Sequence, residues 1–255
     1  QRTATMIAKW QALGFCHGVM NTDNMSVLGI TFDFGPYGFL DHYDPTHICN
    51  HSDHSGRYAF DEQPGVALWN LNVLGHALSL LLPEPAIREA LNKYQPTLQQ
   101  TYSSLMRQKL GLSSHRADDQ QLLTALLNLM QKNRADYTIT WRQLSHVDAH
   151  PQAFIDLFID RDAASAWLDK YLKRTKVDSL SPIERRQLML SVNPKYILRN
   201  HLAQQAIEAA EQGELHPLAT LFAVLKKPFD EQPEHNALAA HPPAWAQDLD
   251  ISCSS

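Results

Sequence analysis

Apolar residues repeat with helical spacing through most of the chain after Gly65. Residues three and four positions apart lie on one side of an α-helix, so each series creates an apolar face that must be buried. The pattern therefore predicts a helical body over residues 66–227. The clearest series are Ala67, Leu71, Leu74, Leu78 and Leu81, then Leu122, Leu126, Leu129 and Met130, and finally Leu218, Leu221, Phe222 and Leu225.

Several helix ends can be read from local signals. A helix over residues 3–15 should end at Gly14, since glycine readily adopts the left-handed conformation that closes a helix. Ser181-Pro182-Ile183-Glu184 is a capping box with proline at the first helical position. Asn193-Pro194 is expected to open a further helix that runs to Gly213. Four tryptophans on apolar helix faces are expected in the core: Trp10, Trp69, Trp141 and Trp167.

The rest of the chain lacks helical periodicity. Val27, Ile30 and Phe32 flank Gly29 in short β-prone runs, which predicts a tight hairpin before Asp33. Residues 34–65 read as one long ordered loop, and loops of that length are usually functional. Beyond Pro228 the chain is rich in Pro and His, so residues 228–255 are expected to be an extended tail. The fold class is mainly α with a small β-hairpin.

Composition excludes several classes of protein. With 44% hydrophobic and 19% charged residues, the 255-residue chain is globular and not disordered. No apolar run approaches the roughly 18 residues that span a bilayer, so no membrane contact is expected. The net charge of −5 argues against binding nucleic acid. Three widely separated cysteines suit a reducing compartment, which predicts a cytoplasmic location.

Acidic residues concentrate between Asp23 and Glu62, where seven acids accompany one base, Arg57. Such a stretch could hold a hard cation such as Mg²⁺, which binds carboxylate and carbonyl oxygens. Acidity alone favours a solvated loop. The same stretch holds His42, His47, Cys49, His51 and His54, whose spacing matches no common zinc finger or ribbon. A hydrogen-bonded loop is the preferred interpretation, in which Arg57 contacts a phosphate or pairs with Asp53.

The order of motifs in residues 3–35 indicates chemistry. A helix is followed by His17-Gly18, then Asn24, then the expected hairpin and Asp33-Phe34-Gly35. Kinase-type phosphotransferases use this order, with the Asn and the second Asp on the metal. The position of their catalytic base is Val19, which cannot accept a proton. Asp23 is the nearest replacement, although an Asp beside an Asn can also simply stabilise the turn.

Longer motifs resemble the selenoprotein O family in its cysteine-containing bacterial form. They are residues 17–24 (HGVMNTDN), 33–39 (DFGPYGF), 50–58 (NHSDHSGRY), 193–199 (NPKYILR) and 252–255 (SCSS). The resemblance implies the C-terminal lobe of a protein-kinase-like (pseudokinase) fold with a helical C-terminal extension. It also implies transfer of AMP from ATP to Ser, Thr or Tyr hydroxyls of proteins, with ATP flipped relative to kinases.

The resemblance also implies roles for single residues. Asp23 would accept the proton, while Asn24 and Asp33 would hold Mg²⁺, or Mn²⁺, with Asp33 also near the ATP. The family's glycine-rich loop, Lys–Glu pair and N-terminal nucleotide-binding lobe are not found in this sequence. The chain is therefore expected to be the C-terminal half of the enzyme, with residues 1–65 as catalytic and metal-binding loops, and to be inactive alone.

Cys253 occupies the tail position that bears selenocysteine in other family members, which implies a redox role. A reversible Cys49–Cys253 disulfide is one hypothesis, with Cys16 buried, and a free tail thiol is the alternative. A non-catalytic pseudokinase scaffold, which Val19 would favour, and a small-molecule phosphotransferase remain open as alternative functions. The sequence does not decide between ATP and UTP as donor, and it is silent on oligomeric state.

Overall fold

The computed structural model describes residues 1–249 and is mainly helical. These residues form two compact units. The first comprises residues 1–38 and 45–105, and the second comprises residues 39–44 and 106–249. The predicted fold class is confirmed in its general form, since the only sheet within residues 1–249 has two short strands.

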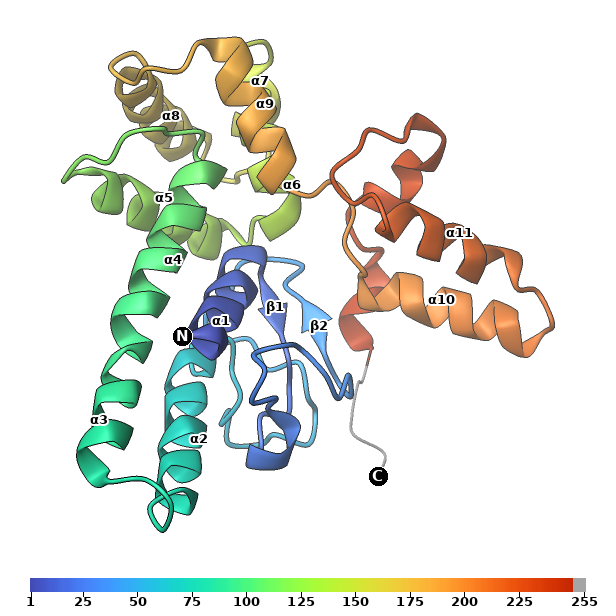
Figure 1. Ribbon diagram of the computed structural model, residues 1–255. Helices are drawn as coiled ribbons and strands as arrows, with labels where there is room; N and C mark the ends of the chain where they lie inside the picture. Colours follow the sequence, from blue (N-terminus) through green and yellow to red (C-terminus); the bar gives the residue numbers. More distant parts are fainter. Residues whose placement is uncertain (250–255) are drawn as a thin grey trace. The chain divides into compact units, whose positions relative to one another are not determined.

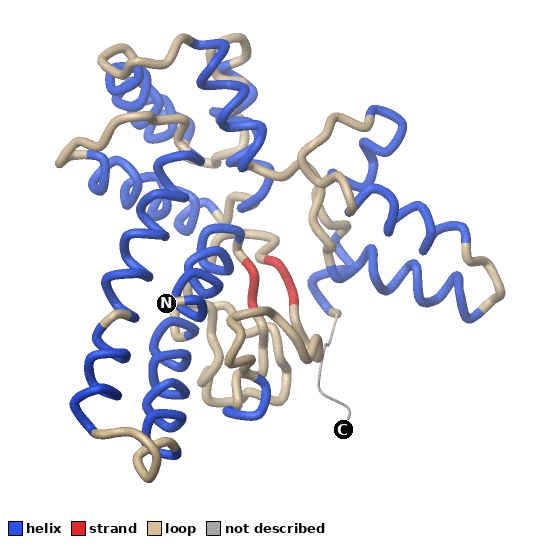
Figure 2. Tube along the Cα trace, viewed as in Figure 1, coloured by secondary structure: helices blue, strands red, loops and turns tan. Residues whose placement is uncertain are grey.

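The first unit contains a helical layer and a long looped segment. Helix α1 (Arg2–Leu13) packs against α2 (Gln63–Ala77), and α2 packs against α3 (Glu84–Asn92). Helix α1 ends at Gly14 with φ of 73°, as its sequence predicts. Helix α4 (Tyr94–Lys109) begins in this unit. Figure 2 shows that the chain between α1 and α2 is almost entirely loop.

The predicted hairpin at residues 27–32 is wrong. The strands are instead β1 (Phe15–Cys16) and β2 (Gly38–Phe39), which pair with each other, and turns occupy residues 27–29. Gly29 adopts φ of 67°, and a Cβ there would lie 2.5 Å from the Cβ of Arg2. The Trp10 indole also donates a 2.9 Å hydrogen bond to the Thr31 hydroxyl. Packing against α1 therefore shapes this segment and overrides its β propensity.

The second unit is built from short helices around a core that includes Trp141, Phe154 and Tyr171. Helix α5 packs against α8, and α7 contacts both α6 and α8. The predicted capping box is present at the start of α9, where the Ser181 and Glu184 side chains bond to each other's backbone amides. The helices are α5 (Asp119–Asn133), α6 (Tyr137–Leu144), α7 (Pro151–Ile155), α8 (Arg161–Thr175) and α9 (Pro182–Val192).

Helices α10 (Asn200–Glu211) and α11 (His216–Leu225) form a hairpin around Leu202, Ala206 and Leu221 (Figure 1). The prediction that a helix opens at Asn193-Pro194 is wrong, because α10 begins seven residues later. The buried Asn193 side chain donates to the Lys109 carbonyl at 3.1 Å, and the amides of Lys195 and Tyr196 donate to the Pro228 carbonyl. These contacts hold residues 193–196 outside a helix.

The expected extended tail is wrong for residues 233–239 and 244–248, which form two 3-10 helices, η2 (Pro233–Ala239) and η3 (Ala244–Asp248). The Tyr196 hydroxyl donates to the Gln232 carbonyl at 2.8 Å, and the Lys195 ammonium contacts Asn236 at 2.6 Å. Among the helices of residues 1–249, none combines the length and apolar character that crossing a bilayer requires.

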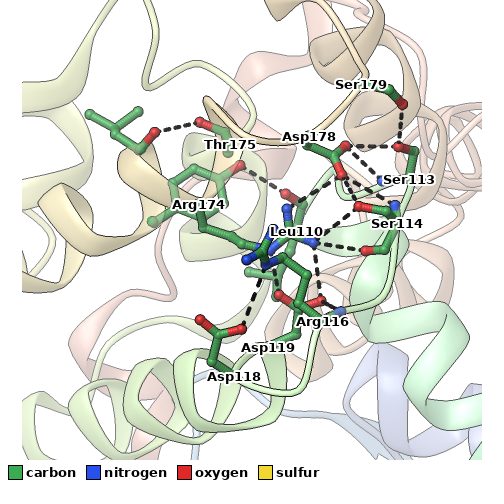
Figure 3. A network of polar contacts seen from close by, with 12 residues as sticks. Leu110, Ser113, Ser114, Arg116, Asp118, Asp119, Arg174, Thr175, Asp178 and Ser179 are labelled. Carbon is green, nitrogen blue, oxygen red and sulfur yellow. Dashed lines mark hydrogen bonds and ion pairs between the residues drawn. The ribbon is translucent and has the colours of Figure 1, made fainter.

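A buried polar network fixes the α4–α5 loop to the end of α8 (Figure 3). The Arg174 guanidinium contacts the Asp119 carboxylate at 2.6 Å and the Ser114 carbonyl at 2.8 Å. Burial alone would raise the pKa of Asp178, but hydrogen bonds from Ser113 and Ser114 outweigh it and hold that pKa well below its usual range. The network gives the loop one fixed conformation in the second unit.

Candidate functional site

Buried amide side chains of α2 hold the turn that follows β1. The Gln63 side chain accepts a 2.9 Å hydrogen bond from the His17 amide and donates one of 2.9 Å to the Phe15 carbonyl. The Asn70 side chain donates to the Met20 carbonyl at 2.8 Å. Both side chains are buried, so these bonds form away from competing water. The backbone of residues 15–20 is thereby fixed before the candidate catalytic residues begin.

The loop after β2 contributes a further contact to the same turn. The buried Asn50 side chain donates to the Gly18 carbonyl at 3.2 Å. Gly18 has φ of 83°, and a Cβ there would lie 2.6 Å from the Pro36 carbonyl oxygen. Only glycine fits this position without displacement of the backbone.

His17 links the turn to the segment that carries Asp33. Its Nε2 lies 2.9 Å from the Phe32 carbonyl oxygen, and its ring stacks on Trp10 with centroids 5.3 Å apart. A proton on Nε2 lets the ring donate to that carbonyl. The His-Gly turn and the Asp-Phe-Gly motif are therefore joined through the residue that precedes Asp33.

Asp23 and Asn24 lie in a 3-10 turn, η1 (Thr22–Asn24), directly after the fixed backbone. The Asp23 carboxylate is exposed. The Asn24 amide nitrogen lies 3.4 Å from the Val19 carbonyl, and this contact leaves the Asn24 carbonyl oxygen as the atom that can bind a cation. The structure thus presents one carboxylate and one amide oxygen side by side in the chain.

Asp33 is exposed and has φ of 57°, a left-handed conformation that is uncommon for a residue other than glycine. Its carbonyl accepts a 2.9 Å hydrogen bond from the Gly35 amide. Such strain often accompanies function. No cluster of three His, Cys, Asp or Glu side chains suited to a metal occurs within residues 1–249. Asn24 and Asp33 nonetheless carry oxygen donors of the kind that Mg²⁺ prefers, and this ion commonly binds through one or two carboxylates together with substrate phosphates and water.

The loop of residues 50–58 is organised by Asp53. Its carboxylate accepts hydrogen bonds from the amides of Arg57 and Tyr58 at 3.0 and 2.7 Å. The Tyr58 hydroxyl donates to the Asn21 side chain, which connects this loop to the candidate catalytic turn. The Arg57 guanidinium lies over the Trp69 ring, 5.2 Å from its centroid. The core prediction for Trp69 is wrong, since half of this side chain is exposed.

The five His and Cys residues of the predicted loop provide no metal-binding group of three or more His, Cys, Asp or Glu side chains within the described part of the chain. Burial lowers the pKa of His42, and the nearby Arg134 lowers it further. Cys49 is only 7% exposed, and its thiol lies 3.6 Å from the Cys16 carbonyl oxygen. Cys16 is buried as expected, and burial beside Cys49 raises the pKa of its thiol. Cys253 lies outside the described residues, so its pairing with Cys49 stays a prediction.

Sequence reasoning missed Gln63 and Asn70. Both are polar residues seven positions apart on α2, so they share one helix face, and both are fully enclosed. A polar pair at helical spacing between apolar residues is the one signal that could have found them.

Comparisons with known proteins agree with these motifs. A family model described as "Protein adenylyltransferase SelO" matches residues 1–226. A protein of Vibrio vulnificus named "Protein nucleotidyltransferase YdiU" is 56% identical over 261 residues. Proteins of the same name from Pectobacterium atrosepticum and Vibrio parahaemolyticus are 55% and 52% identical. Each comparison covers 100% of this chain but only 53 or 54% of the relative, so the chain spans about half their length.

Proposed function

Because the chain belongs to the SelO (selenoprotein O) family, we propose that its full-length protein transfers AMP from ATP to hydroxyl side chains of proteins. One observation carries this proposal. A rigid turn presents Asp23 and Asn24, and His17 joins that turn to the backbone before Asp33. Preorganised polar groups of this kind are what nucleotidyl transfer requires, since positioning and charge stabilisation dominate such reactions.

Each candidate residue has a distinct role in this proposal. Asp23, whose carboxylate is exposed, accepts the proton of the attacking Ser, Thr or Tyr hydroxyl. Asn24 and Asp33 hold Mg²⁺, and Asp33 also lies beside the ATP. The ion, when bound, offsets negative charge on the triphosphate. Val19 lies within the same turn, and because its side chain has no group that accepts a proton, it takes no part in proton transfer.

We also propose that residues 1–65 are the catalytic and metal-binding loops of a kinase-like C-terminal lobe and that residues 66–227 are its helical body. The relatives are about twice as long as this chain. The nucleotide-binding lobe would lie in the remainder of such a protein, so the chain alone should be inactive. The cysteine pattern supports a cytoplasmic location.

A non-catalytic pseudokinase scaffold is the second candidate function, and Val19 is the observation that favours it. The strained Asp33 and the available oxygen of Asn24 favour catalysis instead. A scaffold has no need of either feature.

Label transfer separates these functions. Full-length protein, Mg²⁺ and a mixture of acceptor proteins would be incubated with ATP labelled on either the α- or the γ-phosphate. The proposal expects protein-bound label from the α-phosphate only. Label from the γ-phosphate only would identify a kinase, and no label from either would support the scaffold. Replacing ATP by α-labelled UTP then identifies the preferred donor.

A further inference from the structure

A cavity of about 640 Å³ lies within the second unit, lined by residues of α6, α7, α9 and the chain after α11. A neighbouring hollow of about 230 Å³ shares His146, His150 and Arg186 with it. These three side chains, here called the Arg186 cluster, therefore lie where the two hollows adjoin. None of them belongs to the candidate catalytic site.

The positive charge of Arg186 is not compensated within residues 1–249, where no carboxylate pairs with its guanidinium. The acids that line the two hollows are engaged elsewhere. Asp148 accepts hydrogen bonds of 2.8 and 2.7 Å from Arg185. Glu231 bridges Arg142 and Lys195, with both contacts at 2.6 Å. An anion entering the cavity would thus meet an unpaired, exposed guanidinium.

The same positive potential acts on the imidazole of His146. Burial lowers the pKa of His146, and the charges of Arg186 and Arg142 lower it further. A neutral imidazole beside a guanidinium can donate one hydrogen bond to an anion. His150, which is exposed, offers a second ring at the same junction.

The rest of the larger cavity is apolar in part, since Ile139, Ala153 and Leu157 line it. Its volume falls in the range of about 300–1,000 Å³ that is typical of small-molecule sites. We propose that this cavity binds a small organic phosphate, with the phosphate group on Arg186 and His146 and the apolar part against Ile139 and Leu157. This proposal does not depend on the proposed function.

The test is calorimetric titration of the chain with phenyl phosphate in the absence of divalent cations, so that the candidate metal site does not contribute. Phenyl phosphate should bind more tightly than inorganic phosphate, which lacks the apolar part, and than benzoate, which has a smaller charge. Arg186→Gln should weaken phenyl phosphate binding by about tenfold or more, as expected for loss of a charged hydrogen-bonding group. The imidazole NMR signals of His146 should shift on binding.

The matched control is Arg88→Gln, which removes an exposed arginine on α3 that pairs with Glu84. It should leave phenyl phosphate binding unchanged. The proposal is overturned if phenyl phosphate does not bind, or if Arg186→Gln, folded by circular dichroism, binds it as well as the unsubstituted chain. Equal affinity for benzoate or for inorganic phosphate would overturn the assigned ligand chemistry.

Discussion

Single residues determine whether the candidate site can hold a metal ion. We propose that Asp33 contributes a charge and Asn24 an amide oxygen. His17 contacts the carbonyl of Phe32, directly before Asp33, and the Asn24 backbone amide donates to the Asn21 carbonyl at 3.0 Å. The two proposed ligands differ in how a substitution would affect metal binding. Loss of the Asp33 charge removes the stronger attraction for a divalent cation, while the fold around it should persist because Asp33 is exposed.

Asp33→Asn in the full-length protein should therefore lower the affinity for Mg-ATP by about tenfold or more and abolish most transfer. The control variant is Asp61→Asn, which removes the charge of another exposed aspartate in the same unit. Calorimetric titration with ATP at fixed Mg²⁺ measures the affinity. Unchanged affinity together with normal turnover would show that Asp33 is not a metal ligand.

The network around Arg174 connects α8 to the α4–α5 loop. The Arg174 side chain is only 6% exposed, and Asp119 and Asp178 face it. Removing one partner of a buried ion pair leaves an uncompensated charge, which typically costs about 3–5 kcal/mol. The attachment of the α4–α5 loop to α8 thus depends on the Arg174 guanidinium.

Arg174→Met should lower the free energy of unfolding by about 3 kcal/mol. Lys173→Met, on the exposed side of the same helix, should change it by less than about 0.5 kcal/mol. Urea denaturation of both variants makes the measurement. A loss below about 1 kcal/mol for Arg174→Met would mean that the network contributes little to stability.

The last residue of helix α4, Lys109, is only 3% exposed, and its burial should make the stability of the protein depend on pH. Burial lowers the pKa of Lys109 to about 7, although the ring of Trp141, 4.8 Å from its ammonium, favours the charged form. The unfolded chain has an ordinary lysine pKa and binds more protons between pH 7 and about 10. Stability should therefore rise with pH through that window.

Lys109→Met should abolish this contribution, which amounts to roughly 1 kcal/mol per pH unit. The quantity to compare is the difference in unfolding free energy between the two proteins at pH 7, 8 and 9, because other titrating groups cancel in it. Lys109→Met should be the more stable protein at pH 7, with the advantage shrinking as pH rises. A difference that does not vary with pH would assign Lys109 an ordinary pKa.

Local signals in the sequence predicted most of the helices and the caps at Gly14 and Ser181, because apolar spacing and capping residues act within one element. The predictions of a hairpin at residues 27–32 and of the start of α10 were wrong, because contacts with residues far away in the sequence determine both structures. Gly29 packs on Arg2, and the Asn193 amide bonds to the Lys109 carbonyl, 84 residues away in the chain. No local pattern encodes such pairings.

The candidate site likewise contains residues that the sequence alone suggests and residues that only the structure identifies. Motif order is enough to propose Asp23, Asn24 and Asp33, because the chemistry restricts which residue types can fill these roles, and these assignments stay predictions. The supports Gln63 and Asn70 lie 46 and 50 residues from their backbone partners, so only the folded chain reveals them.

We propose above that Asp23 accepts the proton during AMP transfer and lies in a turn that also binds Mg-ATP. The most direct test of this proposal is mass spectrometry of acceptor proteins after incubation with the full-length protein or its Asp23→Ala variant, alongside calorimetric titration of both with Mg-ATP. We expect AMP on acceptor hydroxyls with the unsubstituted protein, almost none with Asp23→Ala, and similar Mg-ATP affinity for both, because the substitution removes an interaction made only in the transition state. Undiminished AMP transfer by Asp23→Ala, or acceptors that carry phosphate in place of AMP, would contradict it.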